Sequence, residues 1–341
     1  MKLLVLLLGL STFINAQKSA LLKDAVKFPL GASVNPRLMT ENEAYRNIAK
    51  NELTGMTAEN HMKMMLIHPA ADRFDFVKGD EIVAFAAATG KRMHGHTLVW
   101  HNQVPQWMKD FQGDQKAWEE LLKNHIQTVV SHYKGKVAGW DVVNESFLDD
   151  GSLRPSLWAD HVPDYIAKSF QWAHEADPSA ILFYNDYGQD GKPKKMQAIL
   201  DLVAELKRRR IPLHGLGLQM HINVDSKKNE LDEVLTKSVQ TGLKIHLSEL
   251  DIAVNPKNNP DYVYEEKAAK AQSELFNYIF KSYAEIPRKQ QYGITFWNIS
   301  DKDSWLRGYF KRPKEYPLLF DENYSKKPAY TELTKSLNNL N

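Results

Sequence analysis

The chain has 341 residues, of which 43% are hydrophobic and 25% charged, and this composition excludes an intrinsically disordered protein. Its 44 basic and 42 acidic residues leave a net charge of +2, which provides no general attraction to nucleic acid or to an anionic membrane, so we expect no nucleic-acid partner. The chain contains no cysteine, which excludes disulfide bonds.

Residues 1–16 have the features of a secretory signal peptide. Lys2 provides a positive charge, Leu3 to Leu10 form a short apolar core, and Ala16 is a small residue at the expected cleavage site. The apolar stretch is too short for a permanent membrane span, and the alternative is a buried N-terminal helix. We expect secretion to the periplasm or the extracellular space, cleavage near Ala16, no membrane association afterwards, and a mature domain of residues 17–341.

Eight apolar runs alternate with longer stretches along the rest of the chain, and no linker divides them, so one domain is expected. The runs are Leu30–Val34, Leu53–Thr57, Arg92–Val99, Val137–Val143, Ile181–Tyr184, Gly215–Met220, Ile245–Leu250 and Gly293–Trp297. Eight buried strands alternating with helices predict an α/β protein with a (β/α)8 (TIM) barrel. The alternative is an open doubly wound sheet, but Gly31-Ala-Ser-Val-Asn-Pro36 lacks the glycine-rich turn of that fold.

Helical periodicity is clearest in two of the intervening stretches. Apolar residues recur on one helical face between Trp118 and Tyr133, and again between Met196 and Leu206. Lys207 to Arg210 follow the second stretch, and we interpret this basic run as a solvated helix end.

Polar side chains interrupt nearly every apolar run at or near its end, which is where a TIM barrel carries its active site. These residues are Asn35, Glu59, Asn60, His96, His101, Asn144, Glu145, Asn185, Asp186, Gln219, His221, Glu249, Asp251 and, as an aromatic side chain, Trp297.

Two glutamates stand out in this set, because hydrolysis of a glycosidic bond uses a pair of carboxyl groups. Glu145 ends the fourth run and Glu249 lies in the seventh, so both side chains are expected at one barrel mouth. Asn144 is placed to bind a sugar hydroxyl or to orient the second carboxylate. Asp251 is two residues beyond Glu249 and is therefore expected on the same face of the strand.

Six motifs resemble glycoside hydrolase family 10, the retaining xylanases, over roughly residues 30–330. They are Glu59-Asn-His-Met-Lys63, Gly95-His-Thr-Leu-Val-Trp-His101, Trp140-Asp-Val-Val-Asn-Glu145, Gln219-Met-His221, Ser248-Glu-Leu-Asp251, and Phe296-Trp297 with Trp305. The resemblance implies endo-hydrolysis of the β-1,4 bonds of xylan and xylo-oligosaccharides with retention of configuration. Glu145 would be the acid/base and Glu249 the nucleophile.

The same resemblance implies roles for the matched residues around the two glutamates. Glu59, Asn60, Lys63 and Gln103 would bind sugars on the non-reducing side, His96 and Trp100 would line the subsite of cleavage, and Asn144 would hold the 2-hydroxyl group. Gln219 and His221 would position the nucleophile, with Asp251 fixing the tautomer of His221. Trp297 and Trp305 would wall the site, and Tyr187 would lie on the reducing side.

Three alternatives to a xylanase remain open on the sequence. His94-Gly-His96 with His101 and His221 is compatible with a metal hydrolase, although the paired glutamates would have no role in such an enzyme. A non-catalytic sugar-binding barrel usually lacks one carboxylate, whereas both are present here. A β-1,4-glucan or mixed-linkage glucan is an alternative substrate. We expect no cofactor, no metal and a monomer.

Overall fold

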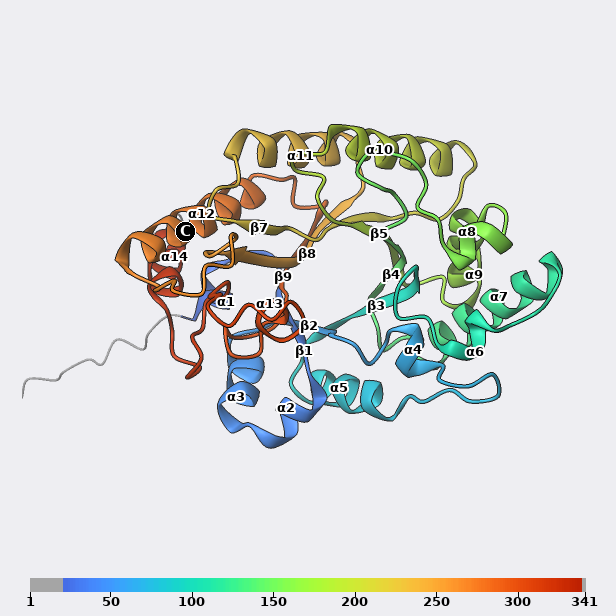
Figure 1. Cartoon of the computed structure of the whole chain (residues 1–341), viewed down its shortest axis with the longest axis horizontal. Helices are drawn as coiled ribbons and strands as arrows, with labels where there is room; N and C mark the ends of the chain where they lie inside the picture. Colours follow the sequence, from blue (N-terminus) through green and yellow to red (C-terminus); the bar gives the residue numbers. More distant parts are fainter. Residues whose placement is uncertain (1–20, 339–341) are drawn as a thin grey trace, which may run out of the picture.

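A closed ring of parallel strands forms the centre of the protein in a computed structural model that describes residues 21–338 (Figure 1). β1 pairs with β2 and with β9, and β6 pairs with β8, so the ring has no free edge. The predicted (β/α)8 barrel is therefore confirmed, and the open sheet is wrong. The predicted signal peptide, residues 1–16, lies outside the described residues. The strands are β1 (Leu30–Val34), β2 (Gly55–Ala58), β3 (Arg92–Trp100), β4 (Gly139–Asn144), β5 (Ile181–Asp186), β6 (Gly215–Leu218), β7 (His221–Asn223), β8 (Lys244–Ala253) and β9 (Gln291–Phe296).

The sixth barrel strand is divided in two, which the sequence did not predict. The run Gly215–Met220 contains only β6, and after Gln219 and Met220 the chain resumes as β7 beside the end of β8. Met220 has a φ of 60°, which bends the chain between the two strands. Because β7 pairs with it, β8 extends to Ala253, and Glu249 lies inside the strand rather than near its end.

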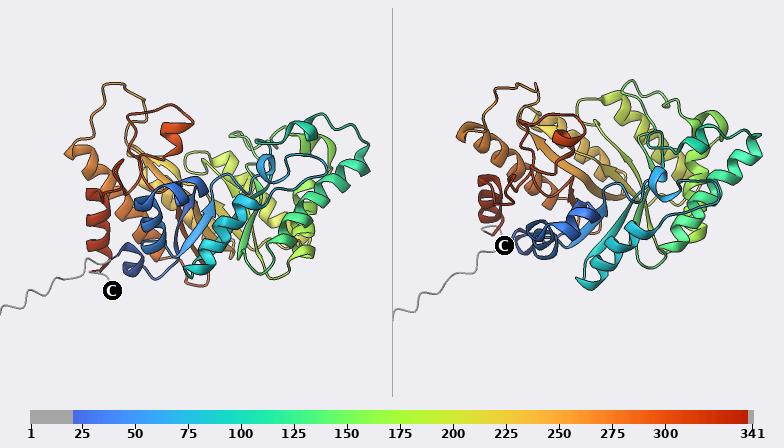
Figure 2. Two further views of the ribbon diagram at one scale, coloured as in Figure 1. Left: turned by 90° about the horizontal axis from the view of Figure 1, so that it is seen from below. Right: turned by 60° about the horizontal axis from the view of Figure 1, so that its bottom comes forward.

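Helices surround the barrel, mostly in the connections between successive strands (Figure 1 and Figure 2). They are α1 (Leu22–Ala25), α2 (Pro36–Glu41), α3 (Glu43–Asn51), α4 (Met64–Ile67), α5 (Val77–Ala88), α6 (Gln106–Lys109), α7 (Gln115–His132), α8 (Leu157–His161), α9 (Tyr165–Ala176), α10 (Pro193–Arg208), α11 (Lys228–Gln240), α12 (Glu266–Ala284), α13 (Trp305–Gly308) and α14 (Pro328–Asn338). Among residues 21–338, no helix is long and apolar enough to cross a membrane.

Helices α7 and α10 illustrate how the sequence determines these elements. The Asp114 carboxylate accepts a hydrogen bond from the Ala117 N–H and caps α7, whose buried face contains Trp118, Leu122 and Ile126 as predicted. Helix α10 begins at Pro193, which needs no hydrogen-bond partner in a first turn. At its other end Arg209 pairs with Asp164, in agreement with the predicted helix end.

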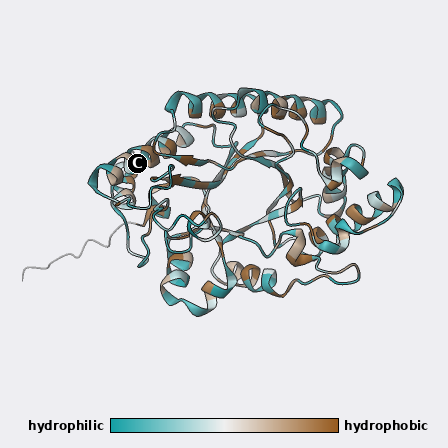
Figure 3. Ribbon diagram, viewed as in Figure 1, coloured by the Kyte–Doolittle hydropathy of each residue, from teal (hydrophilic) through white to brown (hydrophobic). Residues whose placement is uncertain are grey.

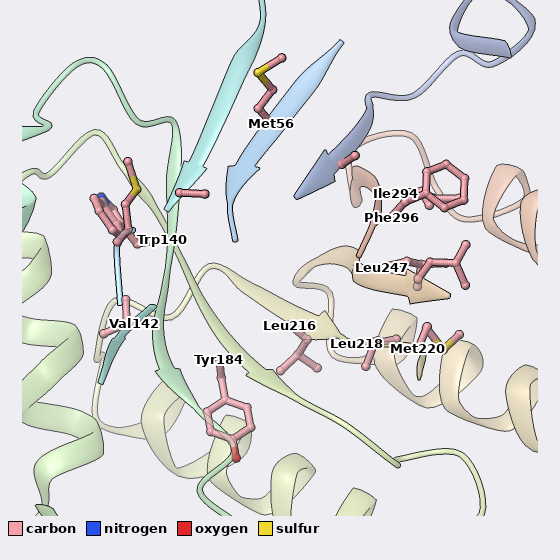
Figure 4. Close-up of a cluster of buried hydrophobic side chains, with 14 of the residues drawn as sticks. Met56, Trp140, Val142, Tyr184, Leu216, Leu218, Met220, Leu247, Ile294 and Phe296 are labelled. Atoms are coloured by element: carbon pink, nitrogen blue, oxygen red, sulfur yellow. The ribbon is translucent and has the colours of Figure 1, made fainter. Parts of the chain in front are cut away.

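Apolar residues gather on the strands and on the helix faces turned towards them, and hydrophilic residues lie mostly on the outer faces of the helices (Figure 3). Figure 4 shows Trp140, Leu247 and Phe296 among the buried side chains on the strands. Gly95 is required beside Trp140, because a Cβ atom there would lie 2.1 Å from the indole ring. This contact fixes β3 closely against β4.

A layer of histidine and aromatic side chains fills the barrel interior in the N-terminal half of the strands. The ring centroids of His94 on β3 and His246 on β8 are 4.7 Å apart, and those of Phe183 on β5 and Tyr292 on β9 are 4.5 Å apart. β3 and β8 are not neighbours in the sheet, nor are β5 and β9, so both ring contacts cross the barrel interior. These rings therefore fill the barrel interior towards the N-terminal ends of the strands. Polar side chains beyond this layer face the mouth at the C-terminal ends.

Candidate active site

Glu145 follows directly after β4 and is held by both its backbone and its side chain. Its φ of 57° is unusual for a residue with a Cβ atom. Its N–H donates to the Asn185 carbonyl, and its own carbonyl accepts from Arg154 Nε at 2.9 Å. These two bonds hold the turn that directs the carboxylate towards the barrel mouth.

Three neutral side chains donate hydrogen bonds to the Glu145 carboxylate. Trp100 Nε1 lies 2.9 Å from Oε2, while Asn144 Nδ2 and Gln219 Nε2 lie 3.2 and 3.0 Å from Oε1. His101 Nδ1 is 3.9 Å from Oε2. The Glu145 side chain is 12% exposed, so it has access to solvent while its direction is fixed.

Glu249, inside β8, has a more buried and more positively charged environment. Asn185 Nδ2 donates to its Oε1 at 2.8 Å, and His221 Nε2 lies 3.3 Å from its Oε2. Burial raises the pKa of this carboxyl group, but His96, His221 and Lys63 outweigh that effect and hold the pKa below its usual value. Glu249 is therefore an ionised carboxylate at neutral pH.

His221 forms an ionic bridge between Glu249 and Asp251. Its Nδ1 lies 2.9 Å from Asp251 Oδ2, and Trp305 Nε1 donates to that same oxygen at 2.6 Å. Burial lowers the pKa of His221, but the two carboxylates outweigh burial and raise the pKa to about 10. At neutral pH both ring nitrogens carry protons, so Asp251 orients an imidazolium rather than selecting one tautomer.

A chain of side-chain amides connects the two glutamates across the barrel mouth. Asn185 Nδ2 donates to Asn144 Oδ1 at 2.9 Å and to Glu249, and Asn144 Nδ2 donates to Glu145. Ser248 Oγ donates to Asn185 Oδ1 at 2.6 Å and fixes the orientation of that amide. The structure thus brings Glu145, Asn144, Glu249 and Gln219 together. The Gln219 amide, which was expected to position the nucleophile, donates instead to Glu145 and to Asn144, because its side chain points towards the end of β4.

Residues after β2 and β9 contact Trp100 at the end of β3 and complete the surroundings of the two glutamates. Lys63 Nζ donates to Asn60 Oδ1 at 3.0 Å and lies 5.1 and 5.3 Å from the rings of Trp100 and Trp297. Glu59 Oε2 accepts a weaker bond, 3.4 Å long, from Asn35. Burial lowers the pKa of Lys63, against the opposing effect of Glu249, Glu59 and Glu145. Lys63 is therefore a buried donor close to both catalytic candidates.

The histidines of β3 are occupied by Asp141 rather than arranged as a metal site. His96 Nδ1 lies 2.9 Å and His94 Nε2 3.0 Å from the two Asp141 oxygens. Burial raises the pKa of Asp141, but the two histidines outweigh it and hold the pKa far below its usual range. Within residues 21–338, no group of three or more His, Cys, Asp or Glu side chains is arranged to hold a metal ion. No hydrogen bond from residues 21–338 engages His96 Nε2, which can therefore contact a ligand, and the His96 ring lies 5.2 Å from that of Trp297.

Among residues 21–338, no hydrogen bond joins Gln103 or Tyr187 directly to either catalytic carboxylate. Within the described part of the chain, the Gln103 side chain makes no hydrogen bond. Tyr187 follows β5, and its hydroxyl accepts a hydrogen bond from Arg154 Nη2 at 2.9 Å. Because Arg154 also binds the Glu145 carbonyl, Tyr187 belongs to the Glu145 side of the site, whereas Gln103 remains a predicted sugar contact.

Several supporting residues were not assigned a role from the sequence. The sequence pattern identifies Asn185 and Asp186 only as polar strand ends, and the charged residue Asp141 inside an apolar run is the signal that could identify a further role. Asp186 and Lys195 form a fully buried ion pair, 2.8 Å long, beneath the Tyr187 ring. Burial, opposed by Lys195 and Tyr184, raises the pKa of Asp186 to about 6. Arg154 lies in a loop and had no detectable sequence signal.

Comparisons with known proteins agree with this geometry. The profile of glycosyl hydrolase family 10 matches residues 19–336. The chain is 36% identical to endo-1,4-beta-xylanase B of Thermotoga neapolitana, over 96% of this chain and 94% of the relative. It is also 38% identical to exoglucanase XynX of Acetivibrio thermocellus over 89% of this chain, but it spans only 28% of that longer protein.

A solved structure is similar over nearly the whole fold. Xylanase 10B of Thermotoga petrophila in complex with xylobiose superposes with a TM-score of 0.87 and 35% identity, over 95% of this chain and 98% of the other. The barrel is closed and carries two glutamates at its mouth, and the family profile matches almost every described residue. These findings support the same family. The chain belongs to glycosyl hydrolase family 10.

Proposed function

We propose that this protein hydrolyses internal β-1,4-xylosidic bonds of xylan by double displacement, with retention of configuration. The observation that carries the proposal is the contrast between the two carboxyl groups. Glu249 is buried, faces the His221 cation and has a lowered pKa, as a nucleophile requires. Glu145 reaches solvent and is held by three neutral donors, which suits a group that exchanges protons.

In the first step, a Glu249 oxygen attacks the anomeric carbon, and the bond from that carbon to the leaving oxygen breaks. The Glu145 carboxyl group gives its proton to the leaving oxygen, so the departing sugar is neutral. In the second step, Glu145 takes a proton from water, the water oxygen bonds to the anomeric carbon, and Glu249 leaves as a carboxylate. Two inversions at one carbon give overall retention.

The surrounding side chains bind the sugars in this proposal. Glu59, Asn60, Lys63 and Gln103 hydrogen-bond to the non-reducing side, with Trp100 and Trp297 beside the Lys63 ammonium. His96, Asn144, Gln219, His221 and Trp305 surround the sugar whose bond is cleaved, and Tyr187 contacts the reducing side. The xylobiose in the related Thermotoga petrophila structure supports a xylose-based ligand.

A β-1,4-glucan is the second candidate substrate, because one long relative is named an exoglucanase. Glucose differs from xylose by a hydroxymethyl group at C5, and one such group changes specificity by about 1–3 kcal/mol. The test is reducing-end release from unsubstituted xylan and from soluble cellulose, by wild type and Glu249→Gln. Xylan cleavage abolished by Glu249→Gln supports the proposal, whereas faster cellulose cleavage or an active variant contradicts it.

We also propose that the protein is exported and acts as a monomer, on the basis of the pattern in residues 1–16 and the near-neutral charge. Expression with its own N-terminus should yield a mature chain that begins at Gln17 outside the cytoplasm. N-terminal sequencing and sedimentation equilibrium test these two statements. An uncleaved cellular chain or a stable dimer would contradict them.

A further inference from the structure

A chain of aromatic contacts leads from the nucleophile to an exposed loop that the proposed mechanism does not use. Trp305 contacts His221 with 4.4 Å between ring centroids, and Phe310 contacts Trp305 at 4.9 Å. Tyr309 contacts Phe310 at 5.1 Å. Tyr309 is 71% and Phe310 46% exposed, so this chain of rings ends in solvent.

The loop that carries these rings is held by its own hydrogen bonds. Tyr309 N–H donates to the Trp305 carbonyl at 2.8 Å, and Arg312 N–H donates to the Leu306 carbonyl at 3.1 Å. Arg307 Nε binds the Pro313 carbonyl at 3.0 Å, and its guanidinium pairs with Glu322. The two exposed rings are therefore presented by a loop whose conformation is fixed by hydrogen bonds. Exposed aromatic rings on such a loop are typical of ligand contacts.

Three cations follow the two rings closely in the chain. Lys311 and Lys314 are exposed, and the Arg312 guanidinium lies 5.4 Å from the Phe310 ring centroid. Within residues 21–338 none of the three forms an ion pair. Glu315, the nearest acidic residue in the chain, is buried, and its carboxylate accepts hydrogen bonds from the N–H groups of Asn255 and Tyr316. Arg312 opposes the effect of burial on the pKa of Glu315, so the two charges interact. The loop thus combines two exposed aromatic rings with the exposed charges of Lys311 and Lys314 and with an arginine beside Phe310.

We propose that this loop, residues 309–314, binds a uronic acid substituent on the polysaccharide, that is, a pyranose ring that carries a carboxylate. The ring stacks through its C–H face on Tyr309, the more exposed of the two aromatic side chains, and the carboxylate faces Lys311 and Arg312. A neutral pentose substituent would use the rings but not the cations. The inference rests on the proposed xylanase function and specifies which xylan the enzyme prefers.

The test compares three polymers: glucuronoxylan, the same polymer after chemical reduction of its carboxyl groups, and unsubstituted xylan. The enzymes are wild type, Tyr309→Ala, a Lys311→Gln/Arg312→Gln variant, and a control. The control, Lys267→Gln/Lys270→Gln, makes the same change in net charge at exposed positions of α12 on the outside of the barrel. The measured quantity is kcat/KM for reducing-end release.

Wild type should cleave glucuronoxylan about three- to tenfold more efficiently than the reduced polymer, and high salt should remove this preference. Lys311→Gln/Arg312→Gln should remove it while leaving the rate on unsubstituted xylan unchanged. Tyr309→Ala should slow cleavage of both substituted polymers. The control should behave as wild type.

Three results would overturn the inference: no preference in wild type, a preference that survives Lys311→Gln/Arg312→Gln, or an equal loss in the control, which would indicate only overall charge. Unchanged cleavage of the substituted polymers by Tyr309→Ala would also overturn the stacking. Failure of the proposed function is distinguishable, because wild type would then cleave none of the three polymers.

Discussion

Asn185 Nδ2 lies 2.8 Å from Glu249 Oε1, and it is the only side-chain amide among the described residues that donates to this carboxylate. The same nitrogen lies 2.9 Å from Asn144 Oδ1, so one group orients the nucleophile relative to the residue beside the acid/base. Asn185 is completely buried, and Ser248 fixes its orientation. The alignment of the two glutamates therefore depends on a residue that itself reaches neither solvent nor leaving group.

We expect Asn185→Ala to reduce kcat/KM on xylan by about 10- to 100-fold, because a hydrogen bond to a charged group contributes about 1.5–3 kcal/mol. Ser248→Ala removes only the bond that orients Asn185 and is the matched control, with a loss of about tenfold or less. Steady-state kinetics, with circular dichroism to verify folding, measures both. A larger loss in Ser248→Ala than in Asn185→Ala would contradict this order.

Glu145→Ala should affect substrates according to their leaving groups. Cleavage of xylan should fall by about 100- to 10,000-fold, because the sugar leaving group needs a proton. A dinitrophenyl xylobioside, whose leaving group needs none, should still form the glycosyl-enzyme in a rapid burst measured by stopped-flow absorbance. Glu249→Ala should lose the burst as well. Equal losses on both substrates in Glu145→Ala would exclude it as the general acid.

The raised pKa of His221 predicts that stability depends on pH. An unfolded histidine has a pKa of about 6.5, and the folded value is about 10. The contribution of the imidazolium is therefore complete below about pH 6.5 and is lost as pH rises towards 10, because the folded state binds more protons in that window. The free energy of unfolding should fall by at most about 5 kcal/mol across it, the limit that this pKa shift sets, as measured by urea denaturation. In Asp251→Asn the fall should still begin near pH 6.5, the pKa of the unfolded histidine, but should end at lower pH and be smaller, because the folded pKa loses the contribution of Asp251. An unchanged curve would contradict the assignment.

Lys195→Met should destabilise the fold by about 3–5 kcal/mol, because it leaves the Asp186 carboxylate buried without its cation. In Lys195→Met/Asp186→Asn no unpaired charge remains, so much of that loss should be recovered. Denaturation of both single variants and of the double variant gives the coupling energy. An additive double variant would mean that the two groups do not interact energetically.

The barrel and the two glutamates could be predicted from the sequence because they follow local rules. Apolar runs identify strands, and a parallel barrel places the strand ends together, so Glu145 and Glu249 meet although about a hundred residues separate them. The break between β6 and β7 could not be predicted, since it depends on pairing with β8. Arg154 could not be predicted either, because its role depends on the fold of a loop.

The protonation of His221 could not be predicted from the sequence either. A histidine beside one carboxylate is a common pattern, and the sequence suggested only that Asp251 would choose a tautomer. The ring is enclosed by two carboxylates from the same strand, Glu249 and Asp251, and only their combined field makes the cation stable.

The bend at Met220 has a kinetic consequence. Gln219, before the bend, donates to Glu145, and His221, after it, binds Glu249, while the Gln219 carbonyl accepts the Glu249 N–H. Three consecutive residues thus support the group that governs bond cleavage and the group that carries the covalent sugar. A displacement of this segment would slow formation and breakdown of the intermediate together. Engineering that seeks to shift the balance between hydrolysis and transfer to another sugar should therefore leave these three residues intact and act elsewhere around the mouth.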